Sequence, residues 1–316
     1  MLSASPNERA ELARMAAAAA ARGVFVGTSS WKYQGWCGFL YDEQRYLYRG
    51  KFAESRFNRD CLEEYASVLP TVCVDGAYYQ FPREKALLEM ASMTPAGFQF
   101  SLKVTDEITI KRFPKLPRFG ARAGQENPNF LDAQLFAHSF LRPCEAIRSR
   151  VGVLLFEFSK FYPTDFEAGR GFVEKLDNFL DRLPADWRYG VEIRNRDFLD
   201  EEYFSLLARH NVAHVFNSWT EMPSVVEQWE MPGSRTANHC AARFLLKPGR
   251  SYEEAVRQFT PYREAQEVYP QGRDAGAAII TSSLQENRRG TFLYVNNRLE
   301  GNALVTLHAM LSKAGL

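Results

Sequence analysis

Eight short runs rich in β-branched and aromatic residues recur along the chain, and they limit its fold more than any other feature. Segments of helical character separate most of them. A strand followed by a helix, repeated in this way, predicts parallel βαβ units, and eight such units close into a barrel. We therefore expect an α/β fold, a (β/α)8 TIM-like barrel in a single domain. The runs are residues 24–30, 71–79, 98–104, 151–159, 188–195, 213–219, 241–247 and 290–297.

The chain length agrees with one barrel. Such a barrel needs roughly 250 residues, and the eight runs are spread over residues 24–297 of a 316-residue chain. We expect residues 24–316 to form the barrel domain and residues 1–23 to form an N-terminal helical extension, which includes a run of six alanines. Long loops are expected at about residues 31–58, 105–129 and 220–240.

Apolar residues at helical spacing predict helices between the strands. Asp200 is a candidate N-cap, and Ser251 with Glu254 three residues later matches a capping box. The predicted helices cover residues 59–69, 83–92, 130–148, 171–183, 200–210, 251–266, 274–286 and 301–313.

Bulk composition excludes several classes of protein. The net charge of +1 does not support a globally basic nucleic-acid binder. Five widely spaced cysteines without a CxxC pair argue against a disulfide framework and indicate a reducing compartment. No apolar run approaches the ~20 residues that span a bilayer, and the first 22 residues lack the features of a signal peptide. We expect a cytoplasmic protein with no membrane partner.

One local stretch is basic. Lys111, Arg112, Lys115, Arg118 and Arg122 fall within a segment that also contains proline and glycine. Such a run is usually a solvated loop, and a specific anion-binding role is the less frequent alternative. This loop keeps nucleic acid open as a partner.

Polar and charged residues stand where most of the predicted strands end, and these ends form the active face of a barrel. Side chains alternate along a strand, so Lys103 and Arg194 should point into the barrel with its other polar residues. We expect Glu192, Glu157 and Asp75 to be catalytic, because nearby carboxylates can take different pKa values and share acid–base work. The expected substrate-binding residues are Lys103, Arg194, Trp31, Tyr79, Asn217, Trp219, Lys247, Asn296 and Asn297.

Two interpretations of these charges stay open. Charges inside a barrel are rarely left unpaired, because burial of one costs several kcal/mol. They therefore either neutralise one another in a salt-bridge network or hold a ligand, and the number of strands that contribute favours the ligand. Lys103 and Arg194 suit an anionic or sugar-like small molecule.

No cofactor is predicted. None of the five histidines stands at a strand end, which argues against a histidine-rich zinc site. A divalent metal bound by Asp75, Glu157 and Glu192 is the alternative. The sequence has no Walker loop, no GxGxxG and no GxSxG motif.

Short blocks along residues 24–312 resemble the YecE-like family, the domain of unknown function 72. They include Val26-Gly-Thr-Ser-Ser-Trp31, Phe98-Gln-Phe-Ser-Leu-Lys103, Val191-Glu-Ile-Arg194 and Tyr294-Val-Asn-Asn297. The resemblance implies a TIM-like barrel and no established reaction. The pocket positions that match are Trp31, Tyr79, Lys103, Glu192, Arg194 and Asn297.

Three departures from the family pattern mark a divergent member. Cys73 and Asp75 stand where the family usually has Glu and Asn. Glu157-Phe-Ser159 replaces the usual Gln-Leu-Pro, and Leu245-Leu-Lys-Pro-Gly249 replaces a His-Gly pair. The ligand or the activity of this branch is expected to differ from that of typical members.

Three functions are compatible with the sequence. The favoured one is an enzyme, of hydrolase or isomerase type, that acts on a phosphorylated or polyhydroxylated small molecule by carboxylate acid–base chemistry. The second is a barrel that binds nucleic acid or processes phosphodiesters, an analogy at the level of fold only. The third is a non-catalytic barrel that binds a metabolite or a partner. The oligomeric state is not predicted.

Overall fold

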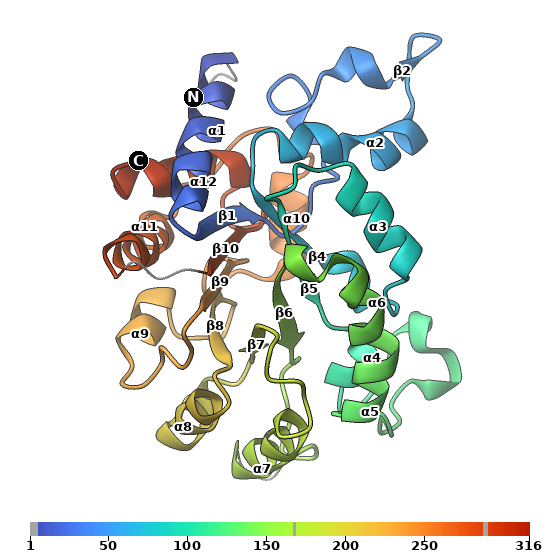
Figure 1. Ribbon diagram of the computed structural model, residues 1–316, viewed down its shortest axis with the longest axis vertical. Helices are drawn as coiled ribbons and strands as arrows, with labels where there is room; N and C mark the ends of the chain where they lie inside the picture. Colours follow the sequence, from blue (N-terminus) through green and yellow to red (C-terminus); the bar gives the residue numbers. More distant parts are fainter. Residues whose placement is uncertain (1–5, 167–168, 287–289) are drawn as a thin grey trace.

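The computed structural model describes residues 6–166, 169–286 and 290–316. Its central feature is a closed barrel of eight parallel strands in the order β1-β10-β9-β8-β7-β6-β5-β4 (Figure 1). The first strand closes the barrel, because it pairs with β10 on one side and β4 on the other. The strands are β1 (Val24–Thr28), β4 (Thr71–Val74), β5 (Gln99–Lys103), β6 (Val151–Glu157), β7 (Tyr189–Glu192), β8 (Ala213–Ser218), β9 (Cys240–Phe244) and β10 (Thr291–Val295). The predicted (β/α)8 fold is confirmed.

Helices surround the barrel (Figure 1), and a two-stranded hairpin, β2 (Leu47–Tyr48) with β3 (Lys51–Phe52), projects from the loop after β1. The α-helices are α1 (Pro6–Ala21), α2 (Glu54–Ala66), α3 (Glu84–Ser92), α4 (Asp106–Thr109), α5 (Ala133–Leu135), α6 (Arg142–Cys144), α7 (Gly169–Leu180), α8 (Glu201–Arg209), α9 (Val225–Glu230), α10 (Tyr252–Phe259), α11 (Pro270–Gln285) and α12 (Ala303–Lys313). No helix among the described residues has both the length and the apolar character needed to cross a membrane.

Two helix starts follow the predicted capping chemistry. The Asp200 carboxylate accepts a hydrogen bond from the backbone N–H of Tyr203 at 2.8 Å at the start of α8. Ser251 and Glu254 form a complete capping box at the start of α10. These side chains satisfy backbone donors that the first turn of a helix leaves unpaired, and so they fix where each helix begins.

Three expectations about local structure were wrong. Residues 130–148 do not form one helix: α5 passes into a π-helix, η5 (Phe136–Leu141), then α6 and a 3-10 helix, η6 (Glu145–Arg150). Pro143 lies in this segment, and proline lacks the N–H that a helix interior needs. Helix α10 ends before Pro261 and does not reach residue 266, because a residue before proline disfavours the helical conformation. Residues 220–240 include α9, which begins with a second capping box, Ser224 and Glu227.

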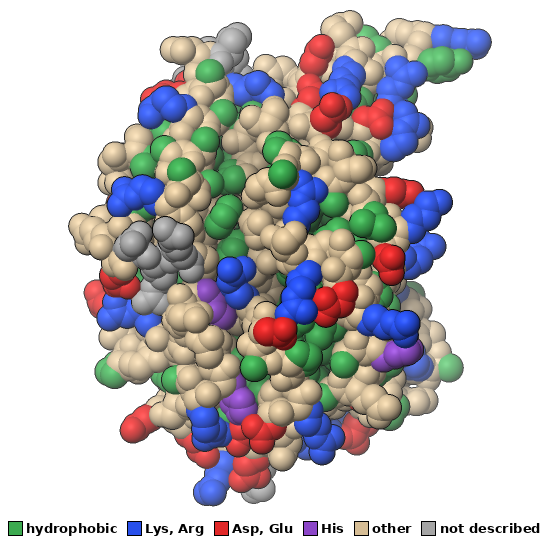
Figure 2. Space-filling model, in the orientation of Figure 1, with side chains coloured by type: hydrophobic (Ala, Val, Ile, Leu, Met, Phe, Trp, Pro, Cys, Tyr) green, Lys and Arg blue, Asp and Glu red, His purple; other side chains and the backbone are tan. Residues whose placement is uncertain are grey.

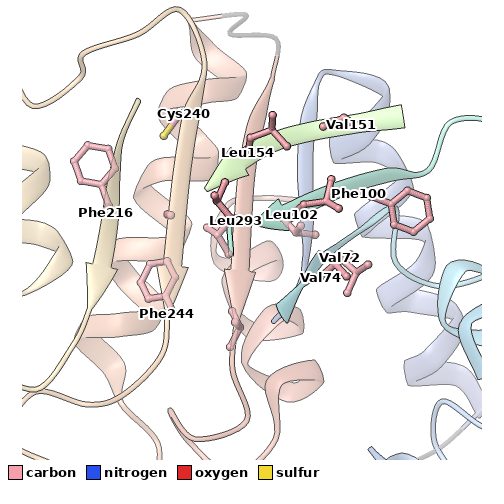
Figure 3. Packing of buried hydrophobic residues seen from close by; sticks show 14 of the residues in the cluster. Val72, Val74, Phe100, Leu102, Val151, Leu154, Phe216, Cys240, Phe244 and Leu293 are labelled. Atoms are coloured by element: carbon pink, nitrogen blue, oxygen red, sulfur yellow. The ribbon is translucent and has the colours of Figure 1, made fainter. Parts of the chain in front are cut away.

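The strands alternate as predicted between an outer and an inner face. Outward side chains such as Phe100 and Leu102 of β5 pack in the large core between the strands and the helices (Figure 3). Inside the barrel, the part away from the carboxyl ends of the strands is mostly apolar, and we call it the lower level. Its buried residues are Cys73, Val153, Leu155, Val215, Ala241, Phe292 and Tyr294.

The inner core depends on glycine for room. A Cβ on Gly152 would lie 2.6 Å from the ring of Phe292, and a Cβ on Gly190 would lie 2.8 Å from Val215 Cγ2. Real Cβ atoms do not approach so closely, so any side chain here would displace the inner core. The Phe292 ring stacks on Phe25, with ring centroids 5.2 Å apart. The lower barrel is therefore filled by side chains and is not a channel.

Helix α1 packs against β1 and α12. Its Leu12, Met15 and Ala16 are fully buried in the main core. Two polar contacts tie it to α12: Glu11 to His308 at 3.3 Å, and the Ser312 hydroxyl to Met15 Sδ at 3.8 Å. Its described part is thus packed against the barrel, while residues 1–5 lie outside the described residues.

Candidate functional site

Six charged side chains meet at the carboxyl ends of the strands, and we call them the charged cluster. They are contributed by β5, β6, β7 and β9 and by the residues that follow β4 and β7. The cluster contains three acids and three bases, so its formal charges balance. Its members are Asp75, Lys103, Glu157, Glu192, Arg194 and Arg243.

Arg243 lies at the centre of the charged cluster. Its guanidinium contacts all three acids: Glu192 at 2.7 Å, Asp75 at 3.4 Å, and Glu157 through a short hydrogen bond. The Arg243 side chain is almost fully buried. Nearby carboxylates raise its pKa well above the ordinary value despite burial, which alone lowers it. A permanently charged guanidinium thus links acids from three strands.

Lys103 and Arg194, the two predicted cations, are also paired. Lys103 Nζ lies 2.8 Å from Glu157 Oε1, and Arg194 Nη2 lies 3.3 Å from Glu157 Oε2. Arg194 makes a further ion pair with Glu192. Alternation places both cations on the inner face, as predicted. Lys103 shares this face with Ser101 of β5, and Arg194 shares it with Glu192 of β7. The structure therefore contains the salt-bridge network that sequence analysis treated as the alternative to a ligand site.

The charged cluster is buried to different depths. Glu192 is fully buried, and Arg194 and Arg243 are nearly so. Lys103 and Glu157 are slightly exposed, and the Asp75 side chain is 33% exposed. Asp75 is therefore the most accessible of the three acids, and Glu157 is the next.

The two more accessible carboxylates have opposite pKa shifts. Burial raises the pKa of Asp75, and the positive charges of Arg243 and Lys103 offset this only in part. Burial acts in the same direction on Glu157, but Lys103, Arg243 and Arg194 outweigh it and hold the pKa of Glu157 well below its ordinary value. Neighbouring carboxyl groups whose pKa values are driven apart are suited to different roles in proton transfer.

Two predicted residues beyond the cluster contact it. Asn217 Oδ1 accepts a hydrogen bond from Arg194 at 2.8 Å, and its amide donates to the carbonyls of Ile193 and Val215. The Trp219 ring centroid lies 4.3 Å from the Arg194 guanidinium carbon, a cation–π contact. Both residues fix the position of Arg194.

The structure places the other predicted residues in different surroundings. Tyr79 is 65% exposed and faces Arg118, whereas the neighbouring Tyr78 is buried, with its ring 3.8 Å from Lys103 Nζ. Lys247 forms an ion pair with Glu267 at 2.7 Å. Trp31 lines a cavity between the barrel and two helices.

The two asparagines after β10 serve the local backbone. Asn296 Oδ1 accepts from the N–H of Arg298 at 3.0 Å, and Asn297 Oδ1 accepts from the N–H of Ala303 at 2.8 Å, next to the first turn of α12. Both are buried. These contacts account for the side-chain oxygen of both asparagines, whereas the buried Asn297 Nδ2 has no hydrogen-bond partner among the described residues.

Sequence reasoning missed Arg243. The predicted strand 241–247 ends three residues after the observed one, Cys240–Phe244, so its end residue was taken to be Lys247. Alternation within Cys240-Ala-Ala-Arg-Phe244 carries the signal, because it places Arg243 on the same face as Ala241, which is in the inner core. Because the end of this strand was predicted three residues too late, Lys247 was assigned to the site in place of Arg243.

The basic loop is largely neutralised by acids. Arg118 pairs with Asp106 at 2.7 Å and Arg122 with Glu107 at 2.8 Å. Lys111 pairs with Glu126, and Arg112 lies 3.5 Å from Asp165. On the face in Figure 2, basic and acidic side chains are also intermingled, with no large basic patch.

A metal bound by the cluster carboxylates stays a prediction. The three acids meet on Arg243, whose positive charge lies between them. Among the described residues, the group whose atoms are spaced for a metal is Asp177, Asp181 and His210, at the C-terminal ends of α7 and α8, and none of the three belongs to the charged cluster. There, Arg209 already lies 2.7 Å from Asp177.

Comparison with known proteins agrees with this fold. A solved DUF72 family protein from Enterococcus faecalis matches with a TM-score of 0.61 at 16% identity, over 93% of this chain and 96% of that one. Another, from Thermotoga maritima, matches with a TM-score of 0.60 at 20% identity, over 93% and 99%. No curated protein matches. The sequence model of the family described as "Protein of unknown function DUF72" matches residues 25–316, and the chain belongs to that family.

Proposed function

We propose that the protein is an enzyme that acts on a polar small molecule at the carboxyl ends of the barrel strands. In this proposal Asp75 transfers a proton to or from the substrate, and Glu157 stays ionised. The observation that carries it is the geometry of these two carboxyl groups, because both contact Arg243 and Asp75 is the more exposed of the two. The opposite shifts of their pKa values support it. A raised pKa brings a carboxyl group closer to the neutral pH at which general acid–base catalysis works best.

The charge balance of the site favours a hydroxyl-rich substrate over a strongly anionic one. Each cation of the charged cluster has a carboxylate partner, so an added phosphate would compete with Glu157 or Glu192 for Arg194 and Lys103. Hydroxyl groups can donate to carboxylates without displacing these pairs. The half-buried ring of Trp219 lies beside the cluster and suits the apolar face of a sugar-like molecule.

Each remaining residue has a defined part. Arg243 holds Asp75 and Glu157 in one arrangement, and Arg194, fixed by Asn217 and Trp219, holds Glu192 and Glu157. A positive charge that develops on the substrate would be stabilised by ionised Glu157. The reaction type is therefore hydrolysis or isomerisation by proton transfer. Nucleic acid is the less favoured substrate, because most cations of the basic loop are already paired with acids.

A ligand screen followed by turnover tests this proposal. Thermal stability of the wild type is measured with neutral sugars and polyols, sugar phosphates, short oligonucleotides and divalent metals. A ligand at ~100 times its Kd stabilises by about 2.7 kcal/mol, which raises Tm by several degrees. We expect a neutral hydroxyl-rich compound to do so and to be converted by the wild type.

The decisive variant is Asp75→Asn, which keeps the shape of the side chain and removes its acid–base chemistry. We expect it to bind the compound and to lose turnover by at least about 100-fold. Asp274→Asn, a surface aspartate paired with Lys313, is the matched control and should keep full turnover. Turnover that survives in Asp75→Asn would contradict the proposal, and ligand binding without turnover in the wild type would favour a non-catalytic binding protein.

A further inference from the structure

A cavity of about 250 Å³ lies outside the barrel wall, between the outer faces of β4 and β5 and the helices α2 and α3. Its apolar lining includes Leu62, Val74, Leu87, Met90 and Leu102. Val74 and Leu102, labelled in Figure 3, belong to the main hydrophobic core and not to the inner core of the barrel. The volume is close to the lower end of those that small-molecule sites occupy.

Cations stand at this cavity without acids. Lys32, Arg59 and Arg83 line it, and none of the described residues that line it is an aspartate or a glutamate. Arg59 pairs with Asp60 beside it in the sequence. Lys32 and Arg83 form no ion pair with described residues, and Lys32 Nζ lies 5.4 Å from the Trp31 ring centroid. An apolar space with cations at its edge is complementary to a molecule that has an apolar body and an anionic end.

Trp31 supplies an independent sign of a ligand. It lines the cavity and is more than nine-tenths buried, and its indole N–H has no hydrogen-bond partner. Buried donors are nearly always paired, so an unpaired one calls for an explanation. An acceptor oxygen on a ligand in the cavity would satisfy this N–H. Charge and the unpaired donor thus point to the same kind of molecule.

We infer that this cavity is a binding site for a small amphipathic anion, a carboxylate on a short aliphatic or aromatic body. The carboxylate lies near Lys32 and Arg83 and accepts from the Trp31 indole, and the apolar body lies on Leu87 and Met90. The site is distinct from the charged cluster and does not depend on the proposed function. It shares two elements with the cluster. One is β5, whose Leu102 lines the cavity and whose Lys103 belongs to the cluster, and the other is the turn η3 (Asp75–Tyr78), whose Gly76 and Ala77 line the cavity.

Octanoate is a suitable probe, with 1-octanol to match its body and acetate to match its charge. We expect octanoate to raise Tm and bind at least ten times more tightly than either control. In an ¹H–¹⁵N spectrum, octanoate should shift the indole resonance that is absent from Trp31→Phe. The variant Ala86→Trp, changed at an exposed position that lines the cavity, should weaken octanoate binding without unfolding the protein.

A charge-matched pair of variants makes the test specific. Lys32→Gln with Arg83→Gln should raise the Kd for octanoate at least tenfold. Lys51→Gln with Lys85→Gln removes two exposed cations that do not line the cavity, and it should leave the Kd unchanged. Lys85 lies on α3, the helix that begins directly after Arg83. The inference is overturned by no octanoate binding, by equal binding of 1-octanol, by an unmoved Trp31 resonance, or by equal loss in both double variants.

Discussion

The two levels of the barrel interior are built on different principles. At the lower level, Phe25, Phe292 and other apolar side chains fill the space, and Gly152 and Gly190 keep it from overfilling. At the upper level, charged groups fill the space and neutralise one another around Arg243. The stability of the lower level depends on how well the side chains fit together. The stability of the upper level depends on every charge having its partner, because removal of one charge leaves another buried without a partner.

Loss of Arg243 should have the largest effect. Arg243→Met leaves Glu192 fully buried with one cation fewer, and breaking a buried ion pair in this way costs roughly 4 kcal/mol. Chemical denaturation at pH 7 measures the free energy of unfolding. The double variant Arg243→Met with Glu192→Gln should recover part of the loss. A single variant as stable as the wild type would show that the charged cluster does not stabilise the barrel.

A deletion at the lower level should cost somewhat less and behave differently with pH. Leu155→Ala removes a fully buried side chain from the inner core and should cost roughly 3 kcal/mol through lost burial and a cavity. No titrating group is involved, so the loss should be the same at pH 5 and pH 8. A loss that changes with pH would mean that the two levels are coupled.

A buried histidine outside both levels tests the cost of charge in the surrounding core. Burial lowers the pKa of His214 to about 4, although a hydrogen bond with Gln228 acts in the opposite direction. The unfolded chain therefore binds a proton between pH 6.5 and pH 4 that the folded protein does not, so stability falls as pH falls. The loss from pH 7 to pH 5 should be about 2 kcal/mol. His214→Phe should flatten this slope, whereas His138→Gln, at an exposed position, should not.

The smallest effect is expected at Asp75. Its pKa is raised in the folded state, so at pH 7 the charged form gains nothing from folding, and the side chain is one-third exposed. Asp75→Asn should change the free energy of unfolding by less than about 1 kcal/mol. Glu157 has a lowered pKa and stabilises the fold above the pKa of the unfolded chain, so Glu157→Gln should be the more harmful change at pH 7 and relatively less harmful at low pH. Equal effects would remove the basis for different roles.

The fold could be predicted because its signals are local. Runs rich in β-branched and aromatic residues identified the eight barrel strands, and alternation within two of these runs placed Lys103 and Arg194 on the inner face. The site was less predictable because its contacts are long-range. Arg243 reaches Asp75, 168 residues away, and no sequence period marks that pairing. Two further errors concerned local boundaries. The end of the strand that contains Arg243 was predicted too late, and the break in the helical segment around Pro143 was not predicted.

Closure of the barrel also sets the order in which the chain can complete itself. Strand β1 has β4 on one side but needs β10, the last strand, on the other, so one edge of the first strand stays open until synthesis is nearly finished. The pairs of Arg243 with Glu192 and Glu157 join residues 51 and 86 positions apart. Such high contact order slows folding. We expect nascent chains that end before β10 to keep hydrated carboxylates and an exposed β1 edge. Such chains should therefore need to be protected by chaperones.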